Sequence, residues 1–226
     1  MMLRIPALLS PDEVRQCRQA LEQAPWQDGR ATAGPLAAQV KANLQLPLDS
    51  QAGQAIGNLI LDRLGASALF MSATLPLKVL PPRFNRYEGG GTYGNHIDNA
   101  IFTIPGTAIK VRSDVSTTVF LSEPDEYEGG ELVVEDTFGH QSAKLAAGDA
   151  IVYPGTSLHR VNPVTRGTRY ASFFWTHSLV ASDEKRRILF DLDQQIQQLT
   201  VRHPGDPALS ALSGTYHNLL RMWSQA

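Results

Sequence analysis

The chain has 226 residues, 42% of them hydrophobic, which is enough for one large domain with a substantial core. Its 20 lysines and arginines and 22 aspartates and glutamates leave a net charge of −2, which gives no reason to expect nucleic acid or a membrane surface as partner. One cysteine excludes an internal disulfide, and no stretch approaches the roughly 18 apolar residues of a membrane helix, so we expect a cytoplasmic protein.

Residues 1–76 have mainly helical patterns and form a predicted N-terminal flank. Ser10 is typical of a helix N-cap, with Pro11 at the first helical position and Glu13 completing a capping box. A second helical pattern covers residues 51–64, where the apolar side chains recur on one face. Both helices therefore need an apolar surface to pack against.

Residues 77–178 change character and predict a β-rich core. Short apolar or alternating runs are bounded by glycine, proline, asparagine and aspartate; they cover residues 78–80, 83–87, 116–121, 131–135, 150–153 and 169–176. Many short strands at this spacing indicate an antiparallel sandwich or jelly roll. The predicted fold class is therefore α+β with a mainly β core.

Residues 179–226 return to helical patterns and predict a C-terminal helical hairpin. The first helix begins at Ser182-Asp183-Glu184, and the second begins at Asp206-Pro207 after the break His203-Pro204-Gly205. The apolar stripes need a partner surface. That surface is either the domain's own sheet or a second subunit, which would make the protein a homo-oligomer through these helices.

The sequence Gly94-Asn95-His96-Ile97-Asp98 places a histidine and a carboxylate two residues apart. Alternate residues of a strand point to the same face, so His96 and Asp98 share a face if this stretch is extended, with Cα atoms about 6–7 Å apart. The two side chains can converge on one metal ion. The third ligand must come from elsewhere in the chain.

His159 is the predicted third ligand, because it follows a turn-rich segment late in the strand-rich zone, where a jelly roll can bring the chain back beside the first pair. The other histidines are expected to be surface or capping residues: His140, His177, His203 and His217. Two imidazoles and one carboxylate leave coordination positions open, as in non-haem Fe(II) oxygenases. A single cysteine excludes a thiolate-rich zinc site.

Arg169 lies ten residues after His159, on the same predicted strand face as Ala171, Phe173 and Trp175. A guanidinium among apolar side chains is costly to bury without an anion, and it pairs a carboxylate through two parallel hydrogen bonds. A dicarboxylate could chelate the metal at one end and meet Arg169 at the other. The alternative is a structural arginine paired with an internal aspartate or glutamate.

This pattern resembles the Fe(II)/2-oxoglutarate-dependent oxygenases, and more narrowly the prolyl and lysyl hydroxylase branch with the bacterial PKHD-type hydroxylases of the PiuC/YbiX-like group. The matching stretches lie within residues 78–178 and are Arg86-Tyr87, Gly91, Tyr93, His96, Asp98, 128–132, 148–150, 158–161 and 167–170. The resemblance implies a double-stranded β-helix. It also implies Fe(II) held by His96, Asp98 and His159, with 2-oxoglutarate on that metal and its distal carboxylate on Arg169.

The same resemblance implies O2 as a second cosubstrate, ascorbate as an auxiliary reductant, and Tyr87 as a pocket hydroxyl; packing between sheets is the equal alternative for Tyr87. The implied activity is hydroxylation of an unidentified small molecule or protein in an iron-uptake context. The alternatives are a cupin-like metal enzyme without 2-oxoglutarate and a non-catalytic iron-sensing module. Residues 99–114, after the first two ligands, form either part of the pocket mouth or an irregular edge strand.

Overall fold

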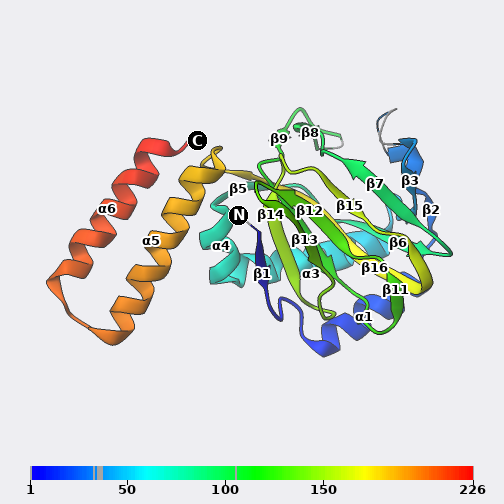
Figure 1. The fold of residues 1–226 in the computed structure, drawn as a ribbon, viewed down its shortest axis with the longest axis horizontal. Helices are drawn as coiled ribbons and strands as arrows, with labels where there is room; N and C mark the ends of the chain where they lie inside the picture. The colour runs from blue at the N-terminus through cyan, green and yellow to red at the C-terminus, as the bar shows by residue number, and fades with distance from the viewer. Residues whose placement is uncertain (1, 33, 35–37, 105, 226) are drawn as a thin grey trace.

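The computed structural model describes residues 2–32, 34, 38–104 and 106–225. Two antiparallel sheets face each other, helices lie against the larger one, and a helical hairpin projects from one side (Figure 1). This arrangement confirms the predicted α+β class, with a double-stranded β-helix between N-terminal helices and a C-terminal hairpin.

The larger sheet is built around one long strand, β16 (Val164–Ser178), which pairs with β10 (Val115–Phe120) on one side and β6 (Arg83–Glu88) on the other. The remaining strands of this sheet are β1 (Leu3–Ile5), β2 (Gln27–Asp28), β4 (Leu44–Gln45), β5 (Pro76–Val79), β11 (Tyr127–Gly129) and β14 (Ala150–Pro154). The runs predicted at 83–87, 116–121, 150–153 and 169–176 are therefore all strands of one sheet.

The smaller sheet contains β13 (Gly139–Ala143), β12 (Leu132–Asp136), β15 (His159–Val161), β7 (Thr92–His96) and β3 (Lys41–Ala42), in that order. A separate ribbon pairs β8 (Ile101–Thr103) with β9 (Lys110–Arg112). Apolar side chains from both sheets, such as Phe120 and Leu132, form one buried cluster between them. Burial of these two facing layers holds the sandwich together.

The N-terminal helices cover the outer face of the larger sheet. They are α1 (Pro11–Glu22), α3 (Gln51–Ala66) and α4 (Ala68–Thr74), and a short 3-10 helix, η1, covers Gly29–Thr32. Leu21, Ile60 and Phe70 of the three α-helices join Phe174 of β16 in a second buried cluster. The predicted capping box at the start of α1 is confirmed.

The N-terminal segment also contributes strands, which the sequence patterns did not predict. β1 pairs with β14, β4 pairs with β6, and β3 pairs with β7, so this segment extends both sheets. Three of its four strands are only two residues long, which is too short for an alternating pattern to show. The division of the chain at residues 76 and 178 stays a prediction.

The C-terminal hairpin consists of α5 (Asp183–Arg202) and α6 (Pro207–Trp223), capped by Ser182 and Asp206. The buried Arg186 donates hydrogen bonds to the carbonyl oxygens of Val180 and Asp114 and ties α5 to the core. A homo-oligomer through this hairpin stays a prediction, as does a cytoplasmic location. None of the helices in the described part of the chain is long and apolar enough to cross a membrane.

Candidate metal centre

Strand pairing brings the three predicted metal ligands together. His96 is the last residue of β7, His159 is the first residue of β15, and the two are direct partners in the antiparallel register. Asp98 lies just past the end of β7 rather than inside an extended strand. The alternation still holds, because Ile97 between them is 58% exposed while His96 and Asp98 turn inward.

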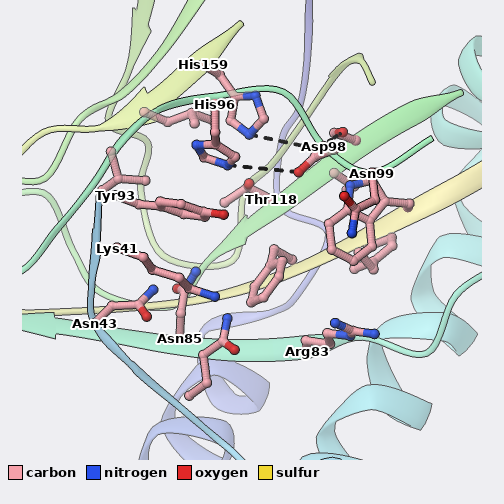
Figure 2. A pocket seen from close by; sticks show the side chains of 18 of the residues that line it. Lys41, Asn43, Arg83, Asn85, Tyr93, His96, Asp98, Asn99, Thr118 and His159 are labelled. Carbon is pink, nitrogen blue, oxygen red and sulfur yellow. Dashed lines mark hydrogen bonds and ion pairs between the residues drawn. The ribbon is translucent and has the colours of Figure 1, made fainter. Parts of the chain in front are cut away.

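The potential ligand atoms of His96, Asp98 and His159 all lie within 4.8 Å of one another. The Nε2 atom of His96 is 3.9 Å from Oδ1 of Asp98, and the Nε2 atom of His159 is 3.8 Å from Oδ2 (Figure 2). Two imidazole nitrogens and one carboxylate converging in this way fit a non-haem Fe(II) ion with further positions left open.

Both imidazole rings are oriented by the backbone. The Nδ1 atom of His96 is 2.8 Å from the carbonyl oxygen of Gly94, and the Nδ1 atom of His159 is 3.0 Å from that of Ser157. A carbonyl oxygen can only accept, so each Nδ1 carries the hydrogen and each Nε2 presents a lone pair. Burial, followed by the charge of His159, lowers the pKa of His96 to about 4, which keeps this ring neutral at pH 7.

Two further residues fix this cluster. Ser116 of β10 donates a hydrogen bond of 2.7 Å to Oδ2 of Asp98. The ring of Tyr93 stacks on the ring of His96, with the centroids 3.5 Å apart and the planes 16° apart. The carboxylate and one imidazole are therefore held in place by neighbours outside the predicted ligand set.

The three residues line one side of a pocket between the sheets, and Arg169 lines the same pocket. Arg169 is 1% exposed, and its Nε and Nη1 atoms have no hydrogen-bond partner among the described residues. It lies near the rings of Tyr87 and Phe120, at 5.4 and 5.3 Å from their centroids. A buried guanidinium with open donors fits the distal carboxylate of a diacid better than it fits an internal ion pair.

The predicted face of β16 is also confirmed. Arg169, Phe173 and Trp175 line the pocket, whereas Tyr170 belongs to the cluster under the helices. Tyr87 lies opposite Arg169 in the register of β6 and β16, and its hydroxyl accepts a hydrogen bond of 3.3 Å from Asn85. Tyr87 is also part of the buried cluster between the sheets, so both of its predicted roles are compatible with its position.

The other histidines lie apart from this group. His140 is exposed on β13, His177 lies near the end of β16, and His203 and His217 are exposed on or beside the hairpin helices. Within the described residues, one group of three or more histidine, cysteine and acidic side chains could hold a metal ion, and it is the group at His96.

Sequence reasoning missed several pocket residues: Lys41, Asn43, Arg83, Asn85 and Ser116. The available signal for Ser116 was the polar Ser116-Thr117-Thr118 inside an otherwise apolar strand, which is unusual in a buried sheet. In the stretch 99–114, β8 and β9 form the separate ribbon, and Phe102 of β8 lines the pocket, which agrees with the expected place at the pocket mouth.

Comparisons with known proteins agree with this geometry. Residues 82–177 match the 2OG-Fe(II) oxygenase superfamily, and residues 183–225 match the PKHD-type hydroxylase C-terminal domain. The chain is 98% identical to a PKHD-type hydroxylase of Delftia acidovorans (strain DSM 14801 / SPH-1), with both chains covered completely. It is 57% identical to the PKHD-type hydroxylase PiuC of Pseudomonas aeruginosa, again over the full length of both.

A solved structure with a similar fold is a Pseudomonas putida prolyl-4-hydroxylase, with a TM-score of 0.52 and 20% identity. The alignment covers 78% of this chain and 92% of that one. At this level of identity the likeness concerns the fold. It shows that the two-sheet sandwich seen here is one on which oxygenases are built.

Proposed function

This chain belongs to the PKHD-type hydroxylases, enzymes of the 2OG-Fe(II) oxygenase superfamily, and from that membership we propose that His96, Asp98 and His159 hold the catalytic Fe(II). We further propose that Arg169 binds the distal carboxylate of 2-oxoglutarate and that the substrate, not yet identified, is hydroxylated at a C–H bond. The observation that carries this assignment is the convergence of the three ligand types within 4.8 Å in the same pocket as a buried, unsatisfied guanidinium.

The metal-binding residues supply two neutral nitrogens and one anionic oxygen. The backbone carbonyls of Gly94 and Ser157 hold the two rings so that each Nε2 faces Asp98. Ser116 engages Oδ2 of the carboxylate and restrains its rotation. Fe(II) bound there supplies O2 activation coupled to the oxidative decarboxylation of 2-oxoglutarate to succinate and CO2.

The cosubstrate end of the pocket supplies orientation. The guanidinium of Arg169 is rigid and planar, so it fixes a carboxylate by two parallel hydrogen bonds. Tyr87, Phe120 and Tyr127 surround it and exclude water, which strengthens that ion pair. Burial raises the pKa of Tyr87, so its hydroxyl stays protonated and can donate to a bound carboxylate.

Succinate release tests the proposal. Purified protein loaded with Fe(II) and supplied with 2-oxoglutarate and O2 should release succinate. Some of this release should occur even when no substrate is added. Arg169→Gln should lower this release while the protein still binds Fe(II). Stoichiometric iron binding with neither 2-oxoglutarate binding nor succinate release would favour the iron-sensing module, and turnover independent of 2-oxoglutarate would favour the cupin-like enzyme.

Two narrower parts of the proposal come from the family resemblance. Ascorbate should raise the number of turnovers before inactivation, because a reductant returns oxidised iron to the ferrous state. An iron-uptake context predicts that the protein becomes more abundant when its host cells are starved of iron. Equal abundance of the protein in iron-replete and iron-starved cells would contradict a role in iron uptake.

A further inference from the structure

A second guanidinium lines the pocket, away from Arg169. Arg83 is the first residue of β6, is half-buried, and lines the same pocket as His96 and Asp98. Figure 2 shows it across the pocket from the imidazole of His96. Neither metal binding nor the carboxylate clamp at Arg169 gives this side chain a role.

Arg83 has no carboxylate partner among the described residues. Several other arginines of this protein are paired, as Arg4 is with Asp149 and Arg86 is with Glu88. Burial lowers the pKa of Arg83 from its ordinary value, and no carboxylate among its causes raises it. A desolvated cation without a counter-ion is costly, and an anion in the pocket would relieve that cost.

Aromatic rings surround this guanidinium. The centre of the group lies 5.6 Å from the ring centroid of Phe102 and 5.5 Å from that of Trp175. These two rings stack on each other with centroids 4.0 Å apart, and Phe173 meets Trp175 edge-on. Ring faces attract a cation without accepting its in-plane hydrogen bonds, so the N–H groups of Arg83 remain available to a carboxylate.

The two arginines lie at different positions along the strand pair. In the register of β6 and β16, Arg83 lies opposite Phe173 and Tyr87 lies opposite Arg169. Four residues of strand separate these positions, which corresponds to about 13 Å at about 3.3 Å per residue. In the proposed function a five-carbon diacid has one carboxylate at Arg169 and its other end at the metal ligands, so it has no charged group left for Arg83.

Lys41 is another cation in the lining of the pocket that also contains Arg83. It lies 5.1 Å above the ring centroid of Tyr93 and is 5% exposed. Burial, and next the charge of Arg83, lowers the pKa of Lys41 to about 8, so it is still mainly charged at pH 7. Asp28 and Asp98 oppose this lowering, so Lys41 adds a positive charge to the pocket that is partly offset by these two carboxylates.

We propose that the substrate of this enzyme is an organic acid whose carboxylate binds Arg83 and whose apolar or planar body lies against Phe102 and Trp175. This inference rests on the proposed function, because the substrate would lie between Arg83, which holds its carboxylate, and the metal ligands. Arg83 then decides which molecules are oriented with a C–H bond towards the iron. A neutral residue inside a peptide chain lacks the group that this end of the pocket recognises.

Binding of matched acids and amides tests the proposal. The probes are benzoate and benzamide, 3-phenylpropionate and its amide, and N-acetylphenylalanine and its amide. Each is titrated anaerobically into protein saturated with Fe(II) and 2-oxoglutarate, so that Arg169 is occupied, with tryptophan fluorescence as the readout. At least one acid should bind wild-type protein about 10- to 100-fold more tightly than its amide, as expected for charge-assisted hydrogen bonds.

Arg83→Gln should bring the ratio of acid affinity to amide affinity close to one. Arg83→Lys should give an intermediate ratio, because lysine keeps the charge but cannot donate two parallel hydrogen bonds to a carboxylate. Arg86→Gln, on the opposite face of the same strand, should keep the wild-type ratio. Circular dichroism shows that the variants fold. The proposal is overturned if no acid is preferred by wild-type protein, or if the preference survives in Arg83→Gln.

Failure of this inference is distinguishable from failure of the proposed function. Wild-type protein that binds 2-oxoglutarate and releases succinate, but prefers no acid over its amide, remains an oxygenase with a different substrate class. Protein that neither binds 2-oxoglutarate nor releases succinate is not the proposed oxygenase. An acid preference that vanishes when 2-oxoglutarate is saturating places the acids at Arg169 and contradicts the role of Arg83.

Discussion

The two ends of the pocket differ in how their polar groups are satisfied. At the metal-binding end, His96 and His159 are fixed by backbone carbonyls and Asp98 is fixed by Ser116. At the cosubstrate end, Arg169 is equally buried but keeps hydrogen-bond donors without partners among the described residues. This difference is the one that the proposed function requires: ligands held ready for a resident ion at one end, and donors left open at the other end for a cosubstrate that binds and leaves in each cycle.

The largest expected effect is a loss of Fe(II) affinity when a ligand at the metal-binding end is replaced. Asp98→Ala removes the one anionic ligand of three and should weaken Fe(II) binding by more than about 100-fold, since loss of a ligand's hydrogen-bond partner alone costs about 10- to 100-fold. Isothermal titration under anaerobic conditions measures this affinity. Asp125→Ala, at an exposed turn, is the matched control, and unchanged iron affinity in Asp98→Ala would contradict the ligand assignment.

The next largest effect should appear at the cosubstrate end alone. Arg169→Gln should weaken 2-oxoglutarate binding by about 10- to 100-fold, because charge-assisted hydrogen bonds are lost, and leave iron affinity near its wild-type value. Arg166→Gln, on the same strand but exposed and paired with Glu128, is the control. A comparable loss of iron in Arg169→Gln would mean that the two ends are not independent.

A smaller loss of Fe(II) affinity should follow when the hydrogen bond that positions Asp98 is removed. Ser116→Ala should weaken Fe(II) binding about tenfold, because Asp98 loses the hydrogen bond that restrains its carboxylate. The affinity for 2-oxoglutarate in iron-saturated protein should change less. Ser142→Ala, on the exposed strand β13, serves as control. If Ser116→Ala behaved like this control, the hydroxyl would have no part in holding the ligand.

The smallest expected effect is a pH dependence of the metal-free protein. The pKa of His96 is about 4 in the fold and 6.5 ordinarily, so between these values the unfolded chain binds a proton that the folded chain does not. Acidification from pH 6.5 towards 4 should therefore lower the free energy of unfolding. Urea titrations of wild-type protein and His96→Gln should diverge over this range, and parallel curves would show that the ring is not held neutral.

The proposed metal ligands could be identified from sequence because their signal is local or chemically distinctive. His96 and Asp98 are two residues apart, and His159 and Arg169 share a strand-rich stretch with a fixed spacing. The turn residues and short apolar runs of the core also predicted β5, β6, β10, β12, β14 and β16, but not β11, β13 or β15. Helix boundaries followed from capping residues such as Ser10, whose hydrogen bonds involve near neighbours.

The remaining pocket residues depend on pairings between distant segments. Lys41 reaches the pocket because the two-residue strand β3 pairs with β7, and no periodicity is visible in two residues. Arg83 faces the pocket because β6 has one particular register against β16. Ser116 meets Asp98 only once β10 is placed in the opposite sheet. Sheet register is a tertiary property, and single-sequence patterns do not fix it.

The direct pairing of His96 with His159 across β7 and β15 has a consequence for insertions and deletions. Replacing one of these imidazoles removes one ligand and leaves the rest of the chain in place. Adding or removing a single residue earlier in β7 would turn every later side chain of that strand to the other face. A one-residue insertion after Thr92 should therefore be more harmful than either histidine substitution, and natural length variation is expected to avoid this strand and to fall in exposed turns.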